Sequence, residues 1–200
     1  ARIRVVAGPE KKSKVVIDKE RKLTAYHEAG HAVVTHFLED TNPVHMITII
    51  PRGSAGGFTS FIPEEDTSFM TKKQMFNDIV SFYGGRAAEE LVLDDISTGA
   101  SNDIERATKI AKAMVTTFGM SDGLGPIMYG QNSGDVFLGR DYGKSQDYSD
   151  KVALEIDEEV RKIIKDAYQT AKEILNEHMD FLHDLATNLL EKETIRKEEF

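Results

Sequence analysis

The amino-acid sequence predicts a mainly α-helical fold that contains a small antiparallel β-sheet and ends in a C-terminal helical hairpin. Apolar residues recur at intervals of three or four along most of the chain, which is the period of an amphipathic helix. Only residues 44–62 show the β-rich, alternating pattern of strands. The 200 residues are 40% hydrophobic, an ordinary composition for a globular domain with one substantial core.

The first predicted elements are a helix and two strands. Two adjacent apolar stripes over residues 22–38 predict a largely buried helix, which ends before Pro43. Residues 44–50 are β-rich and stop at a proline, so they form the first strand. Residues 58–62 alternate after a glycine-containing turn and form its antiparallel partner.

Helices are predicted for most of the chain after residue 70. One helix covers residues 71–93 and contains Gly84 and Gly85, which indicate close helix packing or a kink. The next helix has apolar residues at helical spacing up to Phe118. The same period then returns near the C-terminus.

The remaining segments complete the expected domain organisation. Residues 119–147 are rich in Gly, Asp, Ser and Tyr, and an irregular stretch of this length is typical of a functional loop or of disorder. Apolar stripes over residues 152–174 and 181–190 predict two helices that pair as a hairpin. Residues 1–19 lack such a period and are expected to be a tail or linker ahead of a domain over residues 20–200.

Composition excludes several kinds of site and ligand. The chain has no cysteine, so any metal ion must be held by His, Asp or Glu. Its 34 acidic and 25 basic residues give a formal charge of −9, which argues against a nucleic-acid partner. No apolar run approaches the roughly 20 residues that span a bilayer, so the chain as given is expected to be soluble.

Residues 27–31, with the sequence His-Glu-Ala-Gly-His, combine possible metal ligands with a possible base. Four residues apart in a helix, His27 and His31 project from the same face and can bind one zinc ion. Glu28 can then act as the general base on a zinc-activated water, an arrangement suited to amide hydrolysis. Alternatively, the histidines are unrelated core residues and Glu28 is a solvated charge. The apolar surroundings favour the metal site, because burying two imidazoles without partners is costly.

A catalytic zinc site needs a third protein ligand, and the residue pattern leaves two choices. Asp103 points inward from the first turn of its predicted helix, although aspartate at that position also stabilises a helix end. Glu89 or Glu90 lies on an apolar-faced helix, but either can instead pair with Arg86. The other histidines fall on other faces or elements and are expected to lie outside the site: His36, His45, His178 and His183.

Three segments resemble the FtsH family of membrane-anchored, ATP-dependent zinc proteases: residues 24–32 (TAYHEAGHA), 84–90 (GGRAAEE) and 97–103 (STGASND). Shorter matches extend the resemblance over nearly the whole chain: residues 8–12, 49–53, 124–126 and 136–139. The resemblance implies a helical zinc-peptidase domain in which His27, His31 and Asp103 bind one zinc ion and Glu28 is the catalytic base. Glu89, Glu90 and Arg86 then become candidates for supporting the ligands or the fold.

The resemblance also implies a larger assembly. The protease domain is expected to form a homo-hexameric ring beside an ATPase module, whose last residues the segment 1–19 resembles. The parent protein is expected in a bacterial plasma membrane with this domain on the cytoplasmic side, although organelle relatives leave the origin open. Because the 200 residues contain no Gly-x-x-x-x-Gly-Lys-Ser/Thr loop, ATP is expected to bind only the parent. The chain itself is expected to cleave polypeptides without ATP and without touching the membrane.

The substrate is expected to add as a strand along the edge of the small sheet, next to Gly57, Phe58 and Thr59. Two other functions fit the same helical stripes. The chain can be a non-catalytic oligomerisation or adaptor domain whose histidine helix is simply core. A purely structural metal site is the third possibility, but it needs a fourth protein ligand, for which the sequence offers no obvious candidate.

Overall fold

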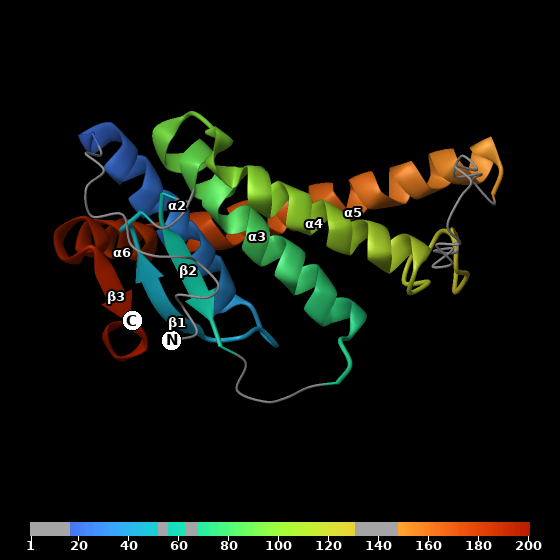
Figure 1. Ribbon diagram of the computed structural model, residues 1–200, viewed down its shortest axis with the longest axis horizontal. Coiled ribbons are helices and arrows are strands. Elements are labelled where there is room, and N and C mark those ends of the chain that lie inside the picture. The colour runs from blue at the N-terminus through green and yellow to red at the C-terminus, as the bar shows by residue number, and fades with distance from the viewer. Residues whose placement is uncertain (1–16, 52–55, 63–67, 131–147) are drawn as a thin grey trace, which may run out of the picture.

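The computed structural model describes residues 17–51, 56–62, 68–130 and 148–200 and confirms a mainly helical fold (Figure 1). The helices of these segments are α2 (Asp18–Phe37), α3 (Lys72–Leu93), α4 (Ser101–Thr116), α5 (Asp150–Glu177) and α6 (Met179–Lys192). The strands are β1 (Val44–Thr48), β2 (Phe58–Phe61) and β3 (Thr194–Arg196), and two 3-10 turns are η1 (Thr98–Ala100) and η2 (Lys197–Glu199). None of the helices in this part of the chain is both long and apolar enough to cross a bilayer.

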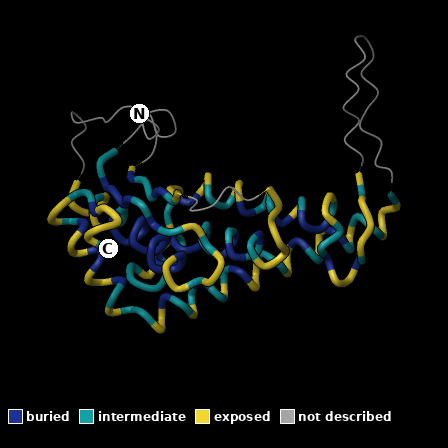
Figure 2. Tube along the Cα trace, turned by 90° about the horizontal axis from the view of Figure 1, so that it is seen from below, coloured by how far each residue is buried: buried dark blue, intermediate teal, exposed yellow. Residues whose placement is uncertain are grey.

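Helices α2 and α3 pack with their backbones in contact. A Cβ atom placed on Gly84 would lie 2.6 Å from the carbonyl oxygen of Gly30, and a Cβ on Gly30 would in turn meet Gly84 and Ala88. Only glycine allows this approach, so the predicted close packing is confirmed. The contact buries the middle of α2, where every residue from 25 to 35 is buried. Figure 2 shows the buried residues gathered where the helices meet.

The polar residues ahead of α3 and α4 fix where these helices begin. Thr71 accepts a hydrogen bond from the amide of Gln74, and the Gln74 side chain accepts one from the amide of Thr71, which forms a capping box. The Ser97 hydroxyl accepts a hydrogen bond from the amide of Gly99 and starts η1. Helix α4 follows directly, with Asp103 in its first turn.

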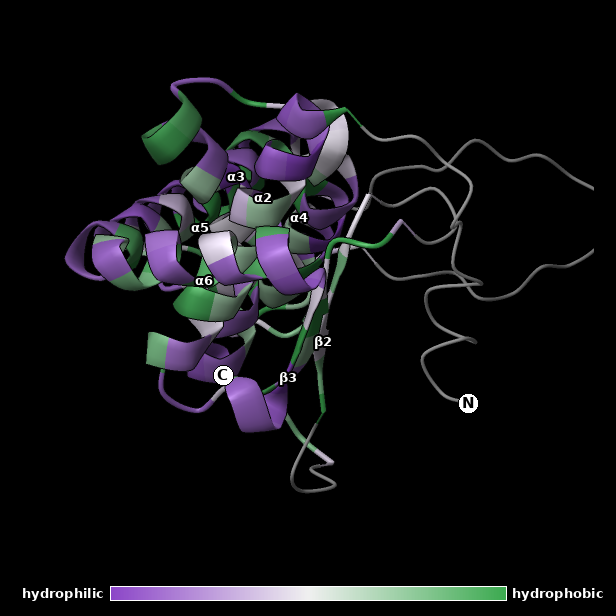
Figure 3. Cartoon of the chain, turned by 90° about the vertical axis from the view of Figure 1, so that its left-hand side faces the viewer, coloured by the Kyte–Doolittle hydropathy of each residue, from purple (hydrophilic) through white to green (hydrophobic). Residues whose placement is uncertain are grey.

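The small sheet has the strand order β2-β1-β3, with all pairs antiparallel. Ile47 in the central strand pairs with Thr59 on one side and with Ile195 on the other. The two predicted strands are therefore confirmed, and β2 is at an edge of the sheet. The sequence did not predict β3, because three residues are too few to show a strand period. Figure 3 shows the sheet edge-on with the labelled helices on one side.

The predicted C-terminal hairpin is wrong, although both of its helices exist. Helix α5 packs along α3 and α4, whereas α6 packs against α2 and touches α5 only slightly. A single non-helical residue, His178, separates the two helices, and such a short link leaves no loop in which the chain can reverse. In Figure 1 the two helices accordingly extend from their junction towards opposite ends of the molecule.

Two predicted segments lie partly outside the described residues. The tail over residues 1–19 stays a prediction, since residues 1–16 are not described and α2 already begins at Asp18. Residues 119–130 are irregular, as expected, with a left-handed backbone at Gly119 and Gly125. Residues 131–147, and with them the matched segment 136–139, lie outside the description.

Candidate metal centre

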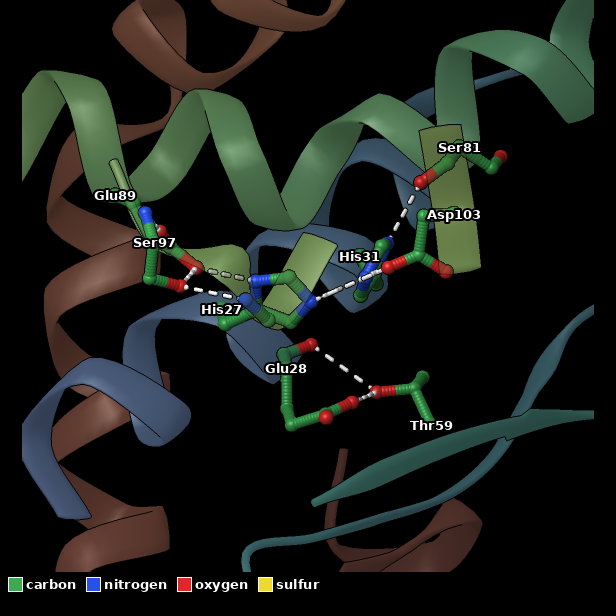
Figure 4. A network of polar contacts seen from close by, with 9 residues as sticks. His27, Glu28, His31, Thr59, Ser81, Glu89, Ser97 and Asp103 are labelled. Atoms are coloured by element: carbon green, nitrogen blue, oxygen red, sulfur yellow. Dashed lines mark hydrogen bonds and ion pairs between the residues drawn. The ribbon is translucent and has the colours of Figure 1, made fainter. Parts of the chain in front are cut away.

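Two histidines from α2 and one aspartate from α4 converge on a single point (Figure 4). The Nε2 atoms of His27 and His31 are 3.1 Å apart, and Oδ2 of Asp103 lies 3.4 Å from the first and 3.5 Å from the second. A tetrahedral ion with ligands at about 2.0–2.1 Å separates its ligand atoms by about 3.3 Å. The spacing of the three atoms therefore fits a zinc ion.

Hydrogen bonds on the far side of each ring fix which nitrogen faces this point. Nδ1 of His27 lies 2.6 Å from Oε1 of Glu89, and Nδ1 of His31 lies 2.8 Å from the carbonyl oxygen of Ser81. An ionised carboxylate and a carbonyl only accept hydrogen bonds, so both Nδ1 atoms must donate. In their neutral forms both rings then turn a lone pair on Nε2 towards Asp103. Three electron-rich atoms meet there, and only a proton or a cation stabilises such a cluster.

Glu89, which contacts His27, is itself held in place by hydrogen bonds. Its side chain is fully buried and accepts hydrogen bonds from the amide of Ser97 at 2.6 Å and from the Ser97 hydroxyl at 3.0 Å. Burial opposes ionisation of Glu89, but the bonds from His27 and Ser97 outweigh it and lower the pKa of Glu89. The structure thus places Glu89 behind His27 rather than among the three converging atoms.

The lack of a side chain at Gly85 leaves space for the His27 imidazole. A Cβ atom on Gly85 would lie 2.6 Å from Cε1 of His27 and 2.7 Å from both of its ring nitrogens. The two adjacent glycines therefore serve different purposes, because Gly84 contacts the backbone of α2 and Gly85 contacts the His27 side chain. The sequence predicted close packing from this pair without distinguishing the two.

The charges around the site favour a cation. Burial disfavours the charged form of His27, but contacts with Asp103 and Glu89 and the charge of Glu28 outweigh it and raise the pKa of His27 to about 10. Burial likewise opposes ionisation of Asp103, yet His27 and His31 hold the pKa of this carboxyl well below its usual range. Three carboxyl groups therefore surround two imidazoles, and a divalent ion would balance them.

Glu28 lies between α2 and β2, on the strand side of the histidines (Figure 4). Its Oε2 accepts a hydrogen bond of 2.6 Å from the Thr59 hydroxyl, and the residue is 7% exposed. Burial raises the pKa of Glu28, and the nearby His27 and His31 offset only part of that increase. A carboxylate with a raised pKa accepts protons more readily than a solvated one.

A cleft of about 880 Å³ passes over these residues. Its walls come from α2, β2, α3 and the start of α4, and the predicted substrate residues Gly57, Phe58 and Thr59 all line it. Because β2 is an edge strand of the described sheet, this wall is the place where an extended chain could pair with it.

Other predicted residues lie away from the converging atoms. Glu90 accepts a hydrogen bond from the Tyr168 hydroxyl and lies 3.4 Å from the Lys172 amine, and Arg86 lies over the Tyr168 ring. Both therefore face α5, and neither Glu89 nor Glu90 forms an ion pair with Arg86 in the described part of the chain. The four histidines expected elsewhere are also outside the cluster, which takes only His27 and His31.

Sequence reasoning missed three contacts of the site: Ser81 with His31, Ser97 with Glu89, and Thr59 with Glu28. The Ser81 contact uses a backbone carbonyl, which leaves no trace in the sequence. Ser97 precedes a predicted helix and carries the signal of a cap, but nothing in that pattern identifies a second partner. The sequence predicts that Thr59 lines the substrate edge, but its contact with Glu28 depends on how the sheet sits against α2.

The family model described as peptidase family M41 matches residues 14–200 of this chain. The chain is 57% identical over 197 residues to the ATP-dependent zinc metalloprotease FtsH 1 of Thermoanaerobacter sp. (strain X514), a match that covers 98% of this chain and 32% of the relative.

Two further relatives show the same pattern. The chain is 54% identical to the ATP-dependent zinc metalloprotease FtsH of Caldicellulosiruptor bescii, with 98% of this chain and 32% of the relative covered. It is 51% identical to the protein of the same name from Bacillus subtilis (strain 168), with 98% and 31% covered. The chain thus spans about a third of the length of these relatives.

Proposed function

The chain belongs to peptidase family M41, and we propose that it is a zinc-dependent endopeptidase that hydrolyses peptide bonds of unfolded or membrane-extracted polypeptides. The observation that carries the proposal is the convergence of His27, His31 and Asp103 at 3.1–3.5 Å, next to a buried glutamate. In this proposal the three residues hold one zinc ion, and Glu28 is the catalytic base.

When bound, zinc polarises the scissile carbonyl and lowers the pKa of a water molecule. Glu28 accepts the proton of that water, since its buried carboxylate lies on the strand side of the ligands and its raised pKa favours proton uptake. The protonated Glu28 can then donate to the leaving amine. His27 keeps its Nε2 lone pair available because Glu89 holds the proton on Nδ1.

The edge strand β2 supports broad specificity. An extended polypeptide that pairs with Gly57, Phe58 and Thr59 would be held by main-chain hydrogen bonds, which do not depend on its side chains. Gly57 also keeps the strand close to α2, since a Cβ there would lie 2.7 Å from the Thr24 side chain. We expect these amides to gain protection from hydrogen exchange when peptide binds.

We extend the proposal to the longer protein that would contain this domain. Relatives named as ATP-dependent zinc metalloproteases support an ATP-dependent protease in which an ATPase module delivers substrates to this domain, and we propose that this protease is a homo-hexamer. We place the whole protein in a bacterial plasma membrane, with this domain on the cytoplasmic side. ATP would act through that module and not through these 200 residues.

The test compares Glu28→Gln with the unaltered chain in zinc content and in hydrolysis of an unstructured peptide without ATP. We expect Glu28→Gln to keep zinc and to lose about 100- to 10,000-fold in kcat, the range for removal of a general base. Glu158→Gln, an exposed change of the same kind on α5, is the matched control and should keep full activity. Equal activity in Glu28→Gln would remove Glu28 from the mechanism, whereas an absence of hydrolysis by the unaltered, zinc-loaded chain would favour a non-catalytic adaptor domain.

A further inference from the structure

The Thr59 hydroxyl contacts Glu28 at two points. It lies 2.6 Å from Oε2 of the side chain and 3.2 Å from the main-chain carbonyl oxygen of Glu28. Among the described residues, no other group donates a hydrogen bond to this carboxylate. One neutral hydroxyl therefore sets the orientation of the proposed base, and Oε1 keeps its lone pairs free for a proton.

Gly57 restrains the same side chain from a second direction. A Cβ atom on Gly57 would lie 2.8 Å from both Cγ and Oε1 of Glu28, so the strand backbone presses against the middle and the end of the side chain. Gly57 directly precedes β2 and Thr59 is its second residue, and both approach the Glu28 side chain. Together they limit rotation of a side chain that otherwise has three free torsions.

The position of Thr59 is itself fixed by the sheet. Thr59 pairs with Ile47 of the central strand, and Ile47 is fully buried in the core. The other side of β2 is the sheet edge at which we place the substrate. The strand that would align the substrate is thus also the strand that orients the base.

We propose that Thr59 is a positioning residue, whose hydroxyl holds the Glu28 carboxylate in the orientation from which it takes a proton from water. This inference rests on the proposed function, because it assigns Thr59 a task only if Glu28 is the base. Substrate binding through the β2 main chain does not need the Thr59 hydroxyl. Removing this hydroxyl should therefore lower kcat and leave KM unchanged.

The test compares Thr59→Val, Thr59→Ser and Ser60→Ala in the zinc-loaded chain with an unstructured peptide. Valine has nearly the shape of threonine and favours strands, so the fold should be kept. We expect Thr59→Val to lower kcat by about tenfold, the lower end for one hydrogen bond to a charged group, with KM and zinc content unchanged. Thr59→Ser keeps the hydroxyl and should restore most of kcat.

Ser60→Ala is the matched control, because it removes a hydroxyl that donates to Met46 on the neighbouring strand and does not touch Glu28. It should keep kcat. Equal kcat in Thr59→Val and the unaltered chain would overturn the inference, as would a loss that Thr59→Ser shares, a loss that appears mainly in KM, or a loss of zinc. Any of these results leaves the Glu28→Gln test intact, so the two proposals fail separately.

Discussion

Two faces of α3 carry similar residues but contact different parts of the molecule. The site face, Ser81, Gly85 and Glu89, touches His31 and His27 and is buried at Gly85 and Glu89. The α5 face, Tyr83, Arg86 and Glu90, meets Tyr168 and Lys172 and is partly exposed at Arg86 and Glu90. Glu89 and Glu90 are neighbours in the sequence, yet they belong to different faces of α3.

The two faces of α3 differ in how well their contacts can tolerate a substitution. On the site face Ser81, Gly85 and Glu89 each contact His31 or His27 directly, so a change at any of them reaches a proposed metal ligand. On the α5 face Glu90 has two partners, Tyr168 and Lys172, and its side chain is 43% exposed, so water can replace either of them. The site face should therefore respond strongly to substitution, and the α5 face weakly.

Gly85→Ala should have the largest effect on zinc binding. The added methyl group would lie 2.6 Å from the His27 ring, and the ring is easier to displace than a backbone. We expect zinc affinity to fall by about 100-fold, the upper end for loss of a supporting contact, while α3 stays helical because alanine favours helices. Chelator competition measures the affinity and circular dichroism the helix content. Arg86→Ala on the α5 face is the control and should bind zinc normally.

Glu89→Gln and Glu90→Gln compare the two faces with the same chemical change. Glutamine at position 89 no longer holds a negative charge behind His27, so zinc affinity should fall by about 30-fold. This lies within the range for loss of a residue that hydrogen-bonds to a metal ligand. At position 90 the change should alter zinc affinity by less than about twofold, because Glu90 faces α5. Similar losses in both variants would contradict the division of α3 into two faces.

The pH dependence of zinc binding gives the third comparison. Below its pKa of about 10, His27 carries an extra proton in the metal-free chain, and zinc binds only the neutral ring. Affinity should therefore rise with pH between 6 and 8, by about tenfold per unit if one proton leaves. The α5 face should not contribute, since Tyr168 and Lys172 lower the pKa of Glu90 and keep it ionised over that interval. An affinity that does not change with pH would contradict the proton on His27.

Local patterns in the sequence predicted most of the fold but only part of the site. Period and spacing located α2 and placed His27 and His31 on one face, because both properties repeat within a few residues. Asp103 is on another helix, where its inward-facing position made it one of two candidates, and only the family resemblance chose it as the third ligand. The residue pattern also left Glu89 and Glu90 equivalent, since choosing between them requires knowing which face of α3 meets α2.

The wrongly predicted hairpin and the missed strand have related physical causes. An apolar stripe shows that a helix is buried but does not identify its partner, so α5 and α6 were assigned to each other rather than to α3 and α2. Strand β3 is three residues long and gains its stability from pairing with β1, a contact that is distant in sequence.

The backbone contact between Gly30 and Gly84 has a consequence for which ions the chain can select. Two helices in such contact cannot slide or tilt past each other, so Glu89 and Ser81 of α3 keep the imidazoles of His27 and His31 in one orientation. Calcium takes six to eight oxygen ligands at about 2.3–2.6 Å and prefers a flexible, oxygen-rich cage. A narrow set of two nitrogens and one oxygen instead suits a small ion that accepts imidazole. Two residues without side chains would thus help to hold the imidazoles in place for such an ion.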